Sequence, residues 1–399
     1  MAVAMRIAQR MGIQNESSRA TKSLFELEMR RRLWWSLVVF DHRICELSDS
    51  KATMLAPIWN CKTPLNVNDF DLRPDMKALP LPYDQPTEAV FTVVRSELGD
   101  FVRRSAFHID FINPSLKLVA GGTQPSSAEA DGGLADLEKR LEEKYLRLCN
   151  PENPLHFMTV WMTQSWLAKY RLFQYLCLHP DSADQTAADR ENAIKDSLTF
   201  LQCDTRLTSS PLTKRFTWLH ELQFPLPAYI YLVQDLTKRA LSDGAELKWR
   251  TMNDNYEARF PDLQDDENLL VRVLGKNVLE AWESLETASK PREPSFATPR
   301  MVTDVRHAAL RKAAKAQNRN VRQPGETPSL HSYDSAMSEN NSPMGLTGHP
   351  SMYGIGGQGF VDPMLGGLQN SLDPALAGNM GLDMDGLDWN AILMQAQGW

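Results

Sequence analysis

The chain has 399 residues, of which 42% are hydrophobic and 23% are charged, with a formal net charge of -7 and a pI near 5.7. This length fits two or three domains with a buried core, while the acidic balance excludes a protein that coats DNA or an anionic membrane by charge alone. Five scattered cysteines give no disulfide framework, and no uncharged apolar run reaches the roughly 18 residues that a membrane span needs.

Apolar residues at helical spacing predict a short first helix that ends near Gly12 and a long amphipathic helix over residues 25–47. The chain begins inside a helical pattern, which suggests further elements upstream, and a first helix without a predecessor is the alternative. Prolines then interrupt residues 57–86, since proline lacks a backbone donor and restricts the preceding residue. A helix is predicted again over residues 89–111, and the small polar and glycine residues of 119–133 predict a flexible loop.

Further helical patterns follow this loop, and strand-like alternation is scarce. Leucines at i, i+3 and i+4 spacing predict an amphipathic helix over residues 134–148. Other apolar helical patterns cover residues 155–178, 187–203, 216–241 and 268–289. We therefore predict an all-α, irregular multi-helix regulatory domain in two parts, residues 1–118 and 134–290.

The composition changes after residue 290. Residues 291–322 form a predicted basic linker, whose stretch 306–322 suits nuclear import, loose phosphate contact or simple solvation. Residues 323–399 contain eight acidic residues and no Lys or Arg, so this tail carries -8. Because the whole chain carries -7, the first 322 residues together carry about +1.

The end of the tail alternates acids with large apolar side chains in a segment too short to bury them. This composition is typical of a disordered acidic activation segment, whose apolar groups stay in solvent until they bind in the groove of a partner protein. A disordered terminus without a function is the alternative. The predicted activation segment contains Asp383, Asp385, Leu387, Asp388, Trp389, Ile392 and Leu393.

The helix predicted over residues 25–47 contains three consecutive arginines, which one leucine separates from a pair of tryptophans. Arginines can hold phosphates, but Glu26 and Glu28 lie within two helical turns, which favours a salt-bridged face beside buried indoles. Asp41 lies on the apolar stripe, where an unpaired carboxylate is costly to bury, so we expect a cation to hold it. A catalytic role for this acid lacks a neighbouring nucleophile or metal ligand.

Three further patterns resemble chemical motifs but lack their context. The glycine pattern at residues 354–359 lies in a low-complexity tail without a preceding strand. The acids at residues 265–267 have leucines where further magnesium ligands would stand, and Phe224 occupies the place of the second histidine after His220. We therefore expect no catalytic residue, no metal and no cofactor in this chain, and no enzyme activity.

The arginine–tryptophan helix resembles the signature of the fungal-specific transcription factor domain, the helical regulatory region of Zn2Cys6 binuclear-cluster regulators. The residues that carry this resemblance, which we interpret as structural, are Glu28, Arg30, Arg31, Arg32, Trp34, Trp35, Asp41 and Arg43. Blocks at residues 8–13, 61–76, 87–98 and 137–156 are also similar to family members. The chain departs from the family where His42 separates Asp41 from Arg43, and it lacks the six-cysteine DNA-binding cluster.

The resemblance implies a nuclear transcription regulator, and the subfamily that it resembles implies a role in secondary metabolism. It implies zinc only in an N-terminal cluster outside these residues, DNA contact only through that cluster or a partner, and contact of the tail with a coactivator or the transcription machinery. Homodimer formation and the choice between activator and repressor stay open. Two alternatives remain: a regulator that acts through a partner or a bound small molecule, and an all-α enzyme with an unrecognised site.

Overall fold

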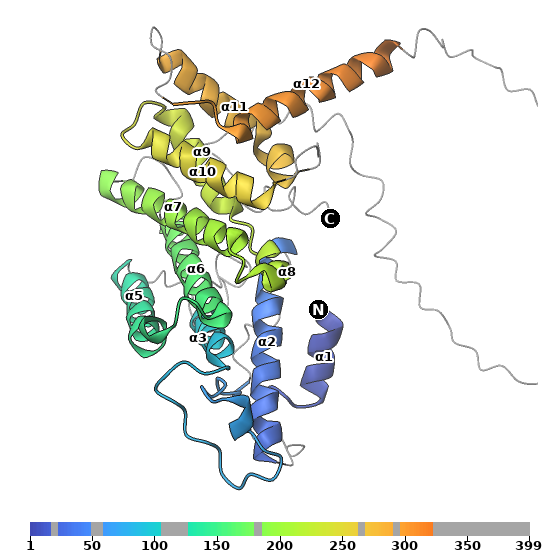
Figure 1. Ribbon diagram of the computed structural model, residues 1–399, viewed down its shortest axis with the longest axis vertical. Coiled ribbons are helices and arrows are strands. Elements are labelled where there is room, and N and C mark those ends of the chain that lie inside the picture. The colour runs from blue at the N-terminus through green and yellow to red at the C-terminus, as the bar shows by residue number, and fades with distance from the viewer. Residues whose placement is uncertain are drawn as a thin grey trace, which may run out of the picture. The chain divides into compact units, whose positions relative to one another are not determined.

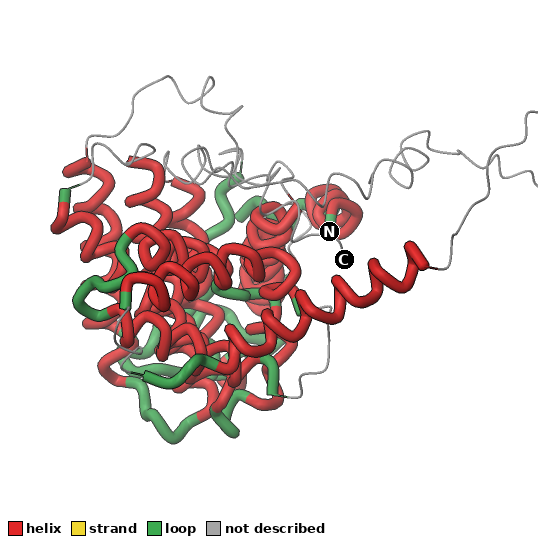
Figure 2. Tube along the Cα trace, turned by 90° about the horizontal axis from the view of Figure 1, so that it is seen from above, coloured by secondary structure: helices red, strands yellow, loops and turns green. Residues whose placement is uncertain are grey.

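The computed structural model describes residues 1–16, 23–48, 59–104, 127–178, 186–261, 268–289 and 296–321. Every regular element in these ranges is a helix, and Figures 1 and 2 show helices with connecting loops. The all-α prediction is therefore confirmed. The chain divides into two compact units, and the described residues up to Arg311 belong to the first, whereas residues 312–321 belong to the second.

The first half of the helical body extends to the end of α6. Its elements are α1 (Ala2–Arg10), α2 (Leu24–Ser48), η1 (Asp69–Asp71), α3 (Val90–Arg104), α5 (Ser127–Lys144), η3 (Leu146–Leu148) and α6 (Pro154–Leu178). The α3 helix packs against both α2 and α6, and α1 lies along α2 (Figure 1). The long α2 helix therefore sits between the first helix and the rest of this half.

The core of this half forms between α3, α5 and α6. Val94 and Leu98 of α3 are buried against Leu137 and Leu141 of α5, and Tyr170 of α6 joins the same cluster. The apolar residues recur three or four positions apart, which places them on one face of each helix. Burial of that face, rather than intrinsic helix propensity, stabilises these helices.

The second half contains the remaining helices. Its elements are α7 (Ala187–Ser209), η5 (Lys214–Phe216), α8 (Thr217–Glu221), α9 (Leu226–Lys238), α10 (Ala245–Arg259), α11 (Leu269–Ala288) and α12 (Arg300–Val321). The α7 helix packs on α6 and also on α9 and α10, so it joins the two halves (Figure 1). Thr186 begins it as an N-cap, because its Oγ1 accepts a hydrogen bond from the Asp189 amide at 3.1 Å.

Aromatic side chains dominate the core of the second half. Trp249 of α10 and Trp282 of α11 are buried edge to face, with ring centroids 5.1 Å apart. Gly275 of α11 allows the close approach of α12, because a Cβ atom at this position would lie only 3.2 Å from Cγ1 of Val305. The start of α12 is thus held against α11 by buried apolar contacts.

The α10 helix lies in a stretch where we predicted no element from the sequence. Trp249, Met252 and Tyr256 are fully buried at a spacing of three and four, but Lys248 and Asn255 are buried beside them. These polar residues break the apolar pattern, and their burial is possible because they have partners. The Nζ atom of Lys248, for example, donates to Oδ2 of Asp235 at 2.6 Å.

The helix predicted over residues 216–241 is divided in the structure. The α8 helix ends at Glu221, and α9 begins at Leu226. Pro225 and Pro227 explain the break, because a proline inside a continuous helix removes a backbone hydrogen bond and clashes with the preceding turn. At the start of α9, however, proline is tolerated, since the first N–H groups of a helix have no partner inside it.

Two predicted boundaries also differ from the structure. The α5 helix begins at Ser127, so the expected loop at residues 119–133 is helical in its last part, while residues 119–126 lie outside the described residues. Alanines there favour helix, and the stripe of buried leucines downstream offsets the cost of two glycines. The predicted linker at residues 291–322 is helical from Arg300, because Met301, Val302 and Val305 are buried.

Candidate functional site

The tryptophan pair of α2 forms the centre of a small core with α1. Trp34 and Trp35 are both buried, and each meets Trp59 edge to face at a centroid distance of 5.3 Å. Nε1 of Trp35 also donates to the Lys62 carbonyl at 2.8 Å. Met5 of α1 belongs to the same cluster. These indoles therefore hold α1 and the segment after residue 59 against α2.

Two glutamates bind the middle arginine of the triplet. Arg31 donates from Nε and Nη2 to the two carboxylate oxygens of Glu16, at 2.8 and 2.7 Å, and its Nη1 lies 3.5 Å from Glu28. Each glutamate also accepts a backbone amide, from Lys62 at 2.9 Å for Glu16 and from Leu65 at 3.0 Å for Glu28. The network thus ties α2 to two segments distant in sequence.

The two glutamates differ in the direction of their pKa shifts. Burial raises the pKa of Glu16, but hydrogen bonds from Arg31 and the Lys62 amide outweigh it, so the net pKa is lowered. Burial is the larger effect at Glu28, which is 0% exposed, and its net pKa is raised although the Leu65 amide and Arg31 favour the ion. Glu16 is therefore the stronger anionic partner.

The flanking arginines are also paired with acids. Arg30 donates from Nε and Nη2 to Glu26 at 3.0 and 2.7 Å. Arg32 lies 3.5 Å from Glu28 and pairs with Asp69 at 2.7 Å. The structure thus brings the predicted arginines together with acids at a boundary between helix and loop, and it gives them no arrangement that would select a phosphate.

Asp41 is buried, with 5% of its surface exposed, as its place on the apolar stripe predicted. Oδ2 of Asp41 accepts no hydrogen bond among the described residues, so the expected close ion pair is not seen at this atom. Arg43 instead donates to the Leu222 carbonyl at the end of α8, which explains why it does not turn back to the acid. Burial raises the pKa of Asp41, and attraction to His42 opposes the rise only in part.

A second buried polar network, which the sequence did not indicate, joins α7, α9 and α10. Asp204 binds Arg259 through two hydrogen bonds of 2.6 and 2.5 Å and accepts a third from Asn255 at 2.7 Å. Tyr229 donates to the Asn255 side chain at 2.9 Å, and Arg259 reaches the His220 carbonyl at 3.1 Å. Burial lowers the pKa of His220. The partners lie far apart in sequence, so no local spacing could have revealed them.

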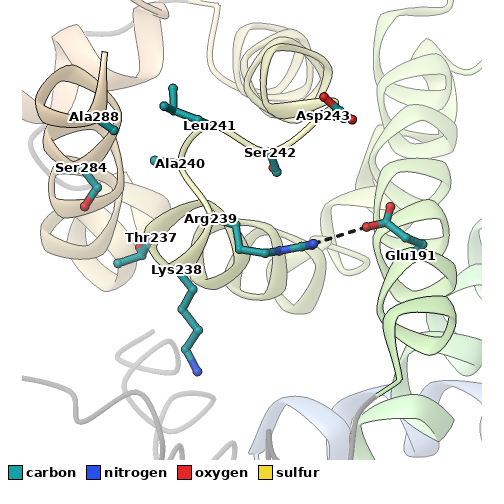
Figure 3. Close-up of a pocket in the computed structure, with 10 residues that line it drawn as sticks. All are labelled: Glu191, Thr237, Lys238, Arg239, Ala240, Leu241, Ser242, Asp243, Ser284 and Ala288. Atoms are coloured by element: carbon teal, nitrogen blue, oxygen red, sulfur yellow. Dashed lines mark ion pairs between the residues drawn. The ribbon is translucent and has the colours of Figure 1, made fainter. Parts of the chain in front are cut away.

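An open groove of about 820 Å³ lies where the ends of α9 and α11 approach the first turns of α7 (Figure 3). Arg239 and Glu191 face each other across it, with Nη1 and Oε1 3.5 Å apart. Lys238 and Asp243 add one charge of each sign. The lining residues therefore select neither an anionic nor a cationic ligand. They also do not place a nucleophile beside a general base.

Residues 1–71 match the family described as the fungal specific transcription factor domain. This part of the chain is therefore similar to the fungal specific transcription factor domain. Every signature residue from Glu28 to Arg43 lies inside the matched range, on the α2 helix whose indoles and glutamates organise the core. The resemblance noted in the sequence is therefore confirmed.

The relatives of the chain carry names of the same kind. It is 43% identical to the transcriptional regulator AacuB of Aspergillus aculeatus, over 98% of this chain and 54% of the relative. It is 40% identical to the transcriptional regulator nsrM of Aspergillus novofumigatus, over 100% and 54%, and 27% identical to the aurofusarin cluster transcription factor aurR2 of Gibberella zeae, over 73% and 43%. The chain thus spans about half the length of the first two relatives. No solved structure matches it.

The remaining candidate sites add no chemistry to this domain within the described residues. In that part of the chain, no three His, Cys, Asp or Glu side chains are grouped as ligands for a metal ion. No helix in the same part is long and apolar enough to cross a membrane. The acids at residues 265–267, the glycine pattern at 354–359 and the predicted activation segment at 383–393 lie outside the described residues.

Proposed function

We propose that the chain is the regulatory portion of a nuclear transcription regulator that controls a fungal biosynthetic gene cluster. Three relatives named as transcriptional regulators or as a cluster transcription factor support this proposal. The single structural observation that supports it most is the use of the signature residues: the indoles and the arginine–glutamate network hold helices together. We assign the domain a regulatory role and no catalytic one.

In this proposal, the helical body positions an activation segment that lies in the acidic tail. Asp383, Asp385 and Asp388 keep the apolar side chains around them in water, and Leu387, Trp389, Ile392 and Leu393 enter the groove of a coactivator or of the transcription machinery. Sequence-specific DNA contact comes from a zinc cluster outside these 399 residues or from a partner protein. The regulator acts as an activator.

The activation role can be tested with a fusion of residues 323–399 to a foreign DNA-binding domain and a reporter gene. We expect activation, and we expect Trp389→Ala with Leu393→Ala to remove most of it, because both side chains supply the apolar contact. A matched control replaces Leu365 and Leu368, which lie in a stretch of the same tail without acids. A silent fusion, or equal loss in the control, contradicts the proposal.

The role in a gene cluster has its own test. Deletion of the gene should lower the transcripts of biosynthetic genes beside it, and its overexpression should raise them. Transcripts that change only elsewhere in the genome would contradict control of a neighbouring cluster.

A further inference from the structure

Partly exposed aromatic side chains gather where α2, α3, α6 and α8 meet. Phe40, Phe91 and Trp161 are half-buried over a floor that includes Met158 and Met162. Trp218 of α8 stacks on Phe40, with ring centroids 6.1 Å apart and planes 2° from parallel, yet 56% of its surface is exposed. Contiguous exposed apolar patches often mark the sites at which a protein contacts a partner.

Arg95 of α3 lies among these rings and has no anionic partner among the described residues. Its guanidinium carbon is 5.1 Å from the Phe91 ring centroid and 5.8 Å from those of Phe40 and Trp166. Its Nε atom is buried without a hydrogen bond, and so is Nε1 of Trp166. Burial lowers the pKa of Arg95 to about 10, so the group remains charged at neutral pH. A buried donor without an acceptor is costly, which makes this arginine a receptor for an anion.

A second arginine lies at the edge of the same cluster. The guanidinium carbon of Arg206, on α7, is 4.4 Å from the Trp161 ring centroid, and the side chain is exposed. We name the six residues Phe40, Phe91, Arg95, Trp161, Arg206 and Trp218 the aromatic–arginine surface. Arginine and tryptophan are the residue types that contribute most to binding at protein interfaces, because they combine a large apolar area with fixed donors.

We propose that the aromatic–arginine surface binds residues 384–394 of the chain itself. This segment contains two acids, Asp385 and Asp388, and no base, which matches the two arginines in number and sign. Leu387 and Trp389 stand beside the acids and supply the apolar groups that the aromatic rings accept. Because the segment belongs to the same chain, its docking is intramolecular, and weak contacts suffice.

The regulatory consequence rests on the proposed function. The docked residues include those that would contact a coactivator, so the helical body and the coactivator compete for them. A ligand or a substitution that weakens this docking increases the fraction of chains in which residues 384–394 are free to bind the coactivator. The sequence of the segment itself does not change.

Photo-cross-linking in the intact chain tests the docking without any transcription readout. We place p-benzoylphenylalanine at position 389 and map the intramolecular cross-links by mass spectrometry. We expect cross-links to peptides that contain Phe40, Trp161 or Trp218. Arg206→Glu should lower their yield about fivefold, the effect of roughly 1 kcal/mol, and Asp388→Arg in that background should restore it.

Further variants keep this test decisive. Arg206 and Lys139 are both exposed, so Lys139→Glu on α5 serves as the matched control and should leave the yield unchanged. Arg95→Met keeps the apolar stem and removes the charge, and it should lower the yield while circular dichroism stays helical. Cross-links to other surfaces, cross-links only between chains, or a yield indifferent to both arginine substitutions would overturn the proposal. An active reporter fusion together with any of these results would leave the proposed function standing and reject the docking alone.

Discussion

At the scale of single residues, the ion pairs of the arginine triplet differ in how much they stabilise the fold. The Arg31–Glu16 pair is formed by side chains that are 5% and 17% exposed, and both hydrogen bonds are short and parallel. The Arg30–Glu26 pair repeats the chemistry four residues apart on one helix, but its acid is 35% exposed. Water competes for the second pair and screens it, whereas it reaches the first pair much less.

Glu16→Gln should therefore reduce the free energy of unfolding by about 2 kcal/mol, because Arg31 stays buried, loses its nearer anionic partner and keeps only Glu28, 3.5 Å away. Glu26→Gln, the matched control on the more accessible pair, should cost less than about 0.5 kcal/mol. Urea unfolding at neutral pH, followed by circular dichroism, measures both. Equal midpoints for the two variants would show that burial does not distinguish the pairs.

For Asp41 we predict that removal of the charge stabilises the fold, whereas removal of the Glu16 charge destabilises it. Because the folded pKa of this acid lies above its ordinary value of 3.8, its ionisation destabilises the fold, and this cost appears as the pH rises through the folded pKa. Asp41→Asn should raise the melting temperature at pH 7 and leave it unchanged below pH 3.8, where both states of the native acid are protonated.

Asp75→Asn is the control for this pH dependence, because Asp75 is exposed and lies in the irregular segment before α3. This substitution should leave the melting temperature at pH 7 close to that of the native chain. A melting temperature lowered by Asp41→Asn at neutral pH would mean that the carboxylate has a cationic partner after all.

At the scale of elements, the sequence predicts helices wherever one face is uniformly apolar. The α6 helix has the bounds expected within one residue, since large apolar side chains recur along its whole length. The α10 helix was missed because Lys248 and Asn255 stand within its buried face, and only their distant partners Asp235 and Asp204 make that burial favourable. Residue types and spacing thus reveal the indole core of α2, whereas networks between remote helices require the tertiary structure.

The turn between α9 and α10 depends on the left-handed backbone of Gly244, whose φ is +85°. A Cβ atom there would meet nothing within 4 Å, so substitution tests backbone strain alone. Gly244→Ala should reduce the free energy of unfolding by about 1 kcal/mol, and Gly244→Asn by less, because asparagine tolerates this conformation better. Urea midpoints that fall equally for both variants would point to a cause other than the φ angle.

At the scale of the whole molecule, charge is divided unevenly along the chain. Residues 323–399 carry -8, and the first 322 residues carry about +1, with a cluster of bases in residues 306–322. The described part of α12 presents Arg311 and Lys312 as exposed side chains. We therefore expect the acidic tail to weaken the binding of the chain to a polyanion such as heparin or DNA, because it repels the ligand that these bases would attract.

Amide substitution of all eight tail acids should convert the chain from a net charge of -7 to about +1 without a change in its length. We expect this variant to bind a heparin column and to elute at higher salt than the native chain, since the tail no longer carries negative charges that repel the sulfate groups of heparin. Arg311→Glu with Lys312→Glu in the neutralised background should return the elution to low salt, because these side chains supply the contact. If the double substitution leaves the elution unchanged, other bases of the body bind the polyanion, and if neutralisation itself has no effect, the tail does not shield the basic helix at all.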